Sequence, residues 1–182
     1  MFRFLKDESG SIIKLFVNQL GMTIFGLLMS FATVSNKTLL LVSSAFSCLF
    51  YFFLLYTAAW EIGARDKVKV DGGRAPKTPQ KGFLLSLFAN APTIIIALLT
   101  ILAYALASRF SLLWAAGAAR ALNFANHLLN GMYVGFTSMI KNELLRIAAF
   151  IALPLPAVLV TGIGYRFGSE NFRLLPSSKS KQ

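Results

Sequence analysis

Four long apolar runs constrain this chain more than any other feature of its sequence. They cover about residues 12–34, 39–60, 83–107 and 144–165. Each run exceeds the ~20 residues that an α-helix needs to cross the hydrocarbon core of a bilayer. Because the backbone polar groups of a segment inside a bilayer must be satisfied within that segment, helices are the structure expected there. The runs therefore predict transmembrane helices.

Composition supports an integral membrane protein. Hydrophobic residues make up 56% of the 182 residues, 17 of which are phenylalanine. A soluble domain of this size cannot cover so much apolar side chain. We therefore expect one membrane domain over residues 1–182, located in the cell membrane as a multi-pass protein. The single cysteine, Cys48, lies inside an apolar run, so no disulfide can form within one chain.

A more polar stretch, residues 117–141, lies between the third and fourth apolar runs. At ~100° of rotation per helical residue, its polar side chains share about a third of a helix circumference. Those in the first half of the stretch are Arg120, Asn123, Asn126, His127 and Asn130. We expect a fifth helix over residues 112–140, with this polar face turned toward the protein interior. The predicted fold is thus all-α, a bundle of about five transmembrane helices.

The connection between the second and third runs, residues 61–82, is the clearest soluble stretch. It carries six basic residues: Arg65, Lys67, Lys69, Arg74, Lys77 and Lys81. Such clusters mark cytoplasmic loops, so this loop and the N-terminus are predicted to be cytoplasmic, with anionic lipid headgroups as partners. Within the loop, Val68 and Val70 alternate with lysines before Gly72 and Gly73, which predicts a short hairpin arm.

Charge counts leave two topologies open. With five helices, and Arg120 kept inside the membrane, eleven basic residues lie inside and six outside. If residues 111–146 stay outside or re-enter, four helices cross, the C-terminus is cytoplasmic, and the counts become thirteen and five. Charge favours the second topology slightly. The length of the segment 112–140 favours the first, and five helices is our prediction.

The residue types argue against catalysis. The presumed spans contain no acidic residue except Glu61 and Glu143 at their edges, and His127 is the only histidine. No zinc-protease or serine-hydrolase motif occurs, and one histidine among asparagines is a poor metal ligand set. We therefore expect no enzyme activity, no cofactor and no metal. The excess of 18 basic over 7 acidic residues is attributed to membrane topology, and nucleic acid is not an expected partner.

Two functional hypotheses remain for the polar face of residues 120–130. In the first, the protein is a transport or transport-accessory component, and these side chains line a cavity in which Arg120 faces an anionic ligand. In the second, it is a non-catalytic membrane-organising or partner-binding subunit that uses the same face and the basic loop for assembly with another membrane subunit. The asparagines and His127 would then bond neighbouring helices, while Arg120 reaches the membrane surface.

Overall fold

The computed structural model describes residues 2–74, 76, 78–110 and 112–172, and all of the regular structure in this part of the chain is helical. Four helical stretches there are long and apolar enough to cross a membrane. They are α2 (Ser9–Thr33), α3 (Lys37–Asp71), α4 (Lys81–Phe110) and the pair α7 (Glu143–Ala152) and α8 (Pro154–Ser169). These agree with the four apolar runs.

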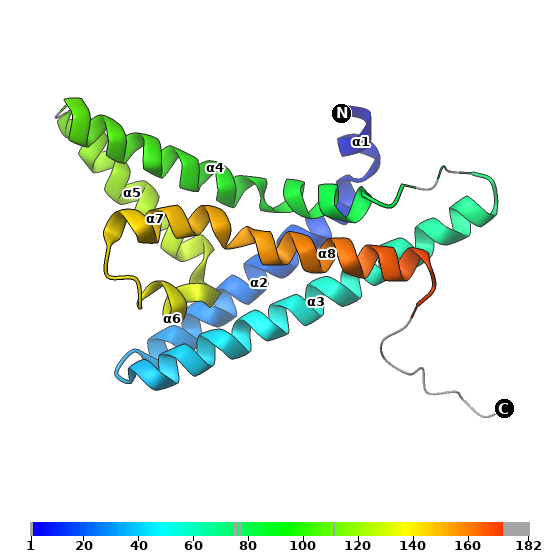
Figure 1. The fold of residues 1–182 in the computed structure, drawn as a ribbon, viewed down its shortest axis with the longest axis horizontal. Helices are drawn as coiled ribbons and strands as arrows, with labels where there is room; N and C mark the ends of the chain where they lie inside the picture. The colour runs from blue at the N-terminus through cyan, green and yellow to red at the C-terminus, as the bar shows by residue number, and fades with distance from the viewer. Residues whose placement is uncertain (1, 75, 77, 111, 173–182) are drawn as a thin grey trace.

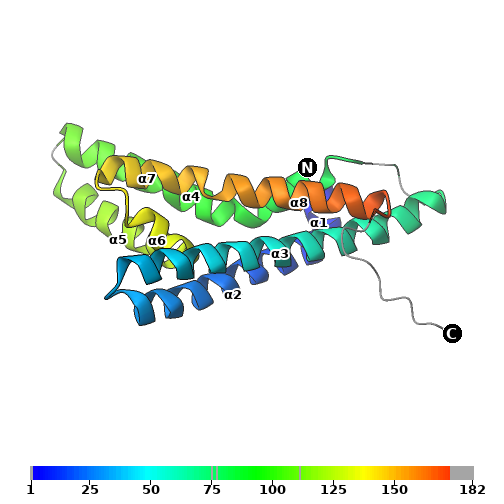
Figure 2. The same ribbon diagram turned by 60° about the horizontal axis from the view of Figure 1, so that its bottom comes forward.

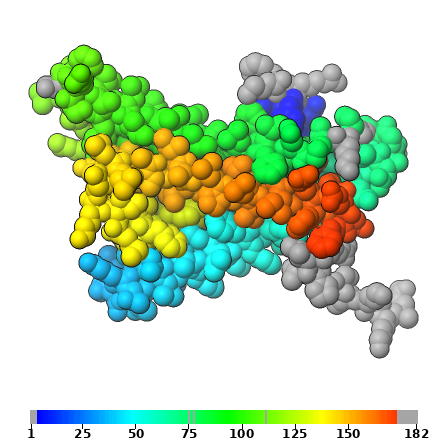
Figure 3. Space-filling view, in the orientation of Figure 1, coloured from blue at the N-terminus to red at the C-terminus, as the bar shows by residue number. Residues whose placement is uncertain are grey.

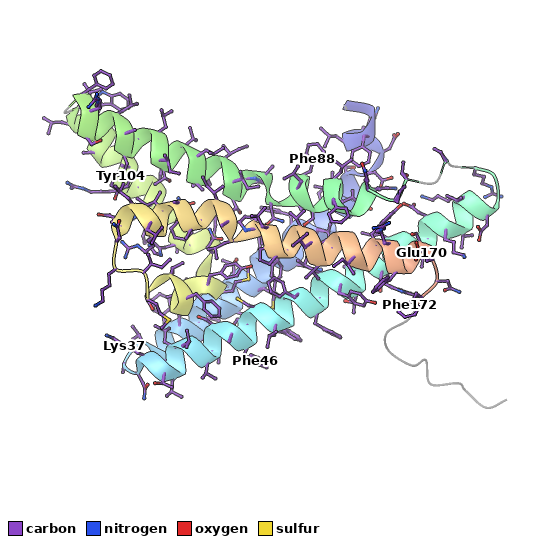
Figure 4. All side chains as sticks on the ribbon, viewed as in Figure 1. Lys37, Phe46, Phe88, Tyr104, Glu170 and Phe172 are labelled. Carbon is purple, nitrogen blue, oxygen red and sulfur yellow. The ribbon has the colours of Figure 1, made fainter. Side chains whose placement is uncertain are left out.

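The long helices lie side by side along the long axis of the molecule (Figures 1 and 2). The turn between α2 and α3 lies at one end, here called the turn end. The connection between α3 and α4 lies at the other, here called the loop end, together with the short N-terminal helix α1 (Phe2–Asp7) and the end of α8. In Figure 4, Lys37 and Tyr104 mark the turn end and Glu170 marks the loop end.

The segment predicted as a fifth span is not one continuous helix. It forms α5 (Leu113–Leu129), a 3-10 turn η1 (Gly131–Tyr133) and the single turn α6 (Val134–Thr137). Seventeen residues give α5 a length of about 26 Å, which is short of the ~30 Å bilayer core. Figure 1 shows the segment running from the turn end toward the middle of the bundle and back to the turn end.

Contacts with α2 and α3 explain why this segment breaks. Gly131 lies so close to Leu27 and the Thr23 carbonyl of α2 that a side chain there would collide with them. The Thr23 hydroxyl donates to the carbonyl of Leu129 at 2.9 Å, which satisfies one of the carbonyls left free at the end of α5. The Ser44 hydroxyl of α3 accepts from the Gly135 N–H at 2.8 Å. These contacts hold the segment from α5 to α6 against α2 and α3.

The predicted loop over residues 61–82 is wrong in its first half. Helix α3 continues to Asp71, so Val68 and Val70 lie on a helix and not in a hairpin arm. Helix α3 meets no helix-breaking residue before Gly72, and the next helix, α4, begins at Lys81. The connection is therefore confined to residues 72–80. Three of the six basic residues, Arg65, Lys67 and Lys69, project from the helical part.

The core is closed mainly by α3 packing against α8. Gly168 of α8 lies against the Trp60 carbonyl of α3, a separation that leaves no room for a side chain. Tyr51 and Leu55 of α3 are buried in the hydrophobic core. In Figure 3, α7 and α8 lie across the visible face between α4 and α3. Large apolar side chains such as Phe31 and Leu49 point outward, as side chains facing lipid would.

Candidate functional site

One face of α4 carries a row of buried polar side chains. Ser86, Asn90, Thr93 and Thr100 are each at most 3% exposed, and buried Ala97 continues the same face. Their spacing of three, four and seven residues places them on one side of an α-helix. From Ser86 to Thr100 the row extends about 21 Å, at 1.5 Å per residue, or about two-thirds of a bilayer core. We call these four residues, with Gln19 and Asn126, the polar row.

Two amide side chains join the polar row from other helices. Gln19 of α2 donates from Nε2 to Thr93 Oγ1 at 3.0 Å. Asn126 of α5 donates from Nδ2 to Thr100 Oγ1 at 2.7 Å. Both amides are buried, and neither Gln19 Oε1 nor Asn126 Oδ1 has a hydrogen-bond partner among the described residues. Each amide is therefore anchored by its nitrogen while its oxygen stays free to accept.

The predicted polar face of α5 is divided by the structure. Asn126 and Asn130 are buried, Asn123 and His127 are half-buried, and Arg120 is exposed. Asn130 donates to the Asn126 carbonyl at 3.0 Å, and the His127 ring packs edge-on against Phe150 of α7 with centroids 5.1 Å apart. Arg120 therefore does not share the interior with Asn126, which differs from the single inward-facing polar face that the sequence predicts.

A second polar region, the ionic cluster, lies at the loop end. Lys81 Nζ lies 2.5 Å from Glu8 Oε1 and 2.6 Å from Asp66 Oδ2, and the Tyr165 hydroxyl donates to Asp66 Oδ2 at 3.0 Å. The Lys81, Asp66 and Glu8 side chains are only 11%, 13% and 17% exposed. Because these residues come from α4, α3, the start of α2 and α8, the cluster ties together all four long helical stretches.

The ionic cluster borders an open cleft of about 650 Å³. Glu8, Asp66, Lys81, Tyr165 and Leu84 line it, together with residues of the 72–80 connection. Leu84 is two residues from Ser86, where the polar row begins. The cleft therefore lies at the loop end of the molecule, where the polar row begins.

The six predicted basic residues do not act as one surface. Lys81 is half-buried in the ionic cluster. Lys69 lies at the edge of this cluster: its side chain is 58% exposed, and its Nζ is 3.4 Å from Asp66 Oδ1. Arg65 and Arg74 are exposed and Lys67 is half-buried. Lys77 lies outside the described residues. No group of acidic, histidine or cysteine side chains suited to a metal ion occurs in the described ranges.

Both polar regions contain residues that the sequence reasoning missed. The polar row follows a regular spacing in the third apolar run, a signal that was present but hidden by the leucines and isoleucines around it. The ionic cluster joins Glu8 and Lys81, which are 73 positions apart, and no local sequence pattern predicts that pairing. Comparison with known proteins adds no name to either site: no family model, curated protein or solved structure matches this chain.

Proposed function

We propose that this chain is a four-span integral membrane protein that works as a transport component, with its solute path along the polar row. The observation that carries the proposal is the free oxygen of Asn126, in a side chain with no solvent exposure. A buried polar atom without a partner is unfavourable, and such groups are retained where a ligand or water pairs with them. Other buried hydroxyls, such as those of Ser47 and Thr161, donate to carbonyls of their own helices, although Asn123 Oδ1, Tyr133 Oη and Arg146 Nε are also buried without a partner among the described residues.

The helix breaks around the polar row support a path. α7 ends at Ala152 and α8 begins at Pro154, and α5 ends at Leu129, whereas α4 continues as a helix through Pro92. In transporters, discontinuous helices commonly line the substrate site near the middle of the bilayer, because irregular backbone is tolerated only inside the protein or along a water-filled cavity. Figures 1 and 2 place the α7–α8 junction beside the middle of α4.

The orientation follows from charge. We place the loop end in the cytoplasm of the cell, because Arg65, Lys67, Lys69 and Arg74 project there and basic residues collect on the cytoplasmic side. With four spans, the N-terminus and the end of α8 both lie on that side. The turn end, with the α2–α3 turn and residues 138–142, then faces outward.

A second candidate function is binding to another membrane subunit. Arg120 is exposed on α5 and makes no ion pair with a described residue, so an acidic residue of a partner helix could pair with it. Under this hypothesis, replacing Arg120 with leucine releases the partner, while replacing Asn126 has no effect on assembly.

Accessibility to water tests the transport proposal without knowledge of the solute. A cysteine at Asn126, in a background with Cys48 replaced by serine, should react with a small hydrophilic methanethiosulfonate reagent in membrane vesicles. The matched control is a cysteine at Thr161, which is equally buried but donates its hydroxyl to the Ala157 carbonyl of its own helix at 2.7 Å. Equal and negligible labelling at both positions would contradict a solute path.

A further inference from the structure

The hydrogen-bond geometry at Asn126 determines which atom of its amide is free. Thr100 has one hydroxyl proton, and it donates that proton to the Ile96 carbonyl at 2.7 Å. Thr100 Oγ1 can therefore only accept from Asn126, which must present its Nδ2 at 2.7 Å. The network thus fixes the orientation of the amide, and the group left without a partner is the acceptor Oδ1.

Gln19 makes a similar amide–hydroxyl contact further along α4, but the Thr93 hydroxyl donates to no carbonyl of the described residues, so this contact alone does not fix the orientation of the Gln19 amide. Its Nε2 is held by Thr93, its Oε1 has no partner, and the side chain is 4% exposed. Thr93 and Thr100 are seven residues apart on one face, which separates the two anchoring points by about 10 Å along the helix axis. A small molecule moving along this face meets one free amide oxygen and then the other.

The charge of the interior limits what these oxygens can receive. Apart from tyrosines and Cys48, every buried polar side chain in the described ranges is a serine, threonine, asparagine or glutamine. A desolvated ion requires an opposite charge or several hydrogen bonds, which neutral amides spaced about 10 Å apart do not supply. Arg120 of α5 is exposed, and Arg146, whose Nε is buried without a hydrogen-bond partner among the described residues, lies on α7 and not in the polar row. The pairing chemistry therefore favours an uncharged donor.

We propose that Gln19 and Asn126 accept hydrogen bonds from an uncharged solute that carries O–H or N–H groups, as a small polyol or an amide does. This inference rests on the proposed transport function and names the chemical class of its substrate. It replaces the anionic ligand that Arg120 suggests in the sequence. Discrimination comes from the acceptor oxygens, because a solute without donors leaves them unpaired.

Stopped-flow light scattering on proteoliposomes tests the proposal, with glycerol and urea as uncharged donor probes and phosphate and methylammonium as ionic probes. We expect glycerol or urea to enter faster than in protein-free vesicles, and the ions not to. Asn126→Leu should slow that entry at least about tenfold, the factor that corresponds to 1.4 kcal/mol. Asn18→Leu is the matched control, since Asn18 is the partly exposed neighbour of Gln19.

The variant Asn126→Asp separates the effect of the hydrogen-bonding group at this position from the effect of side-chain shape. The carboxylate has nearly the same shape and adds a negative charge, so glycerol or urea entry should fall and methylammonium entry should rise. If only phosphate enters through the wild-type protein, or water alone does, the uncharged-solute proposal is overturned while a membrane path remains. If no probe enters faster than in protein-free vesicles, the transport function itself fails.

Discussion

The ionic cluster and the polar row are both polar regions inside an apolar bundle, but they are satisfied differently. In the ionic cluster, the ammonium group of Lys81 has two carboxylate partners within 2.6 Å, and Tyr165 adds a hydrogen bond to Asp66. In the polar row, Gln19 and Asn126 each use only the nitrogen of the amide. A satisfied network fixes helices, whereas free acceptors remain available to a ligand.

The largest expected effect comes from breaking the ionic cluster. Lys81→Met leaves Glu8 and Asp66 as two nearly buried carboxylates without their shared cation. Removing one partner of a buried ion pair costs about 3–5 kcal/mol, and we expect about 3 kcal/mol because the side chains keep some exposure. Chemical unfolding of the purified protein in mixed micelles measures the change in free energy of unfolding.

Lys69→Met is the matched control for this variant. Lys69 contacts the same carboxylate, Asp66, but at 3.4 Å and with 58% of its side chain exposed. Exposed ion pairs contribute about 0–1 kcal/mol, so its loss should be small. Equal destabilisation by Lys81→Met and Lys69→Met would show that the ionic cluster is no more structural than an ordinary surface pair.

The smallest expected effect on stability comes from the polar row. Asn126→Leu removes one hydrogen bond between helices, and such bonds average ~0.6 kcal/mol in membranes. The free energy of unfolding should change by less than about 1 kcal/mol, while solute entry slows at least about tenfold. A loss as large as that of Lys81→Met would mean that Asn126 is structural, and the contrast between the two regions would disappear.

The sequence predicts the long helices well because each apolar run satisfies its backbone alone and needs no distant partner. It cannot predict where α5 ends, since the close approach of Gly131 and Leu27 depends on residues about a hundred positions apart. The buried position of Asn126 follows from helical spacing. That Arg120 lies outside does not, because it depends on how α5 packs beside α4.

The two polar regions also differ in how far each can be predicted from the sequence. The α4 part of the polar row follows a local pattern, with a polar or small residue every three or four positions from Ser86 to Thr100. Hydropathy hides it, because serine and threonine hydroxyls bond carbonyls of their own helix and are tolerated in apolar runs. The ionic cluster depends on the meeting of four separate segments, so Lys81 reads in the sequence as one more loop cation.

The accessibility of residue 141 tests the central claim, that residues 113–142 enter and leave at the turn end. Single cysteines at Lys141, Lys37 and Thr78, in a background without Cys48, are to be labelled with an impermeant maleimide in intact cells and in opened membranes. Four spans predict that residue 141 is labelled like residue 37, from outside, and that residue 78 is labelled only after opening. If residue 141 is labelled like residue 78, the segment crosses the membrane and the account is contradicted.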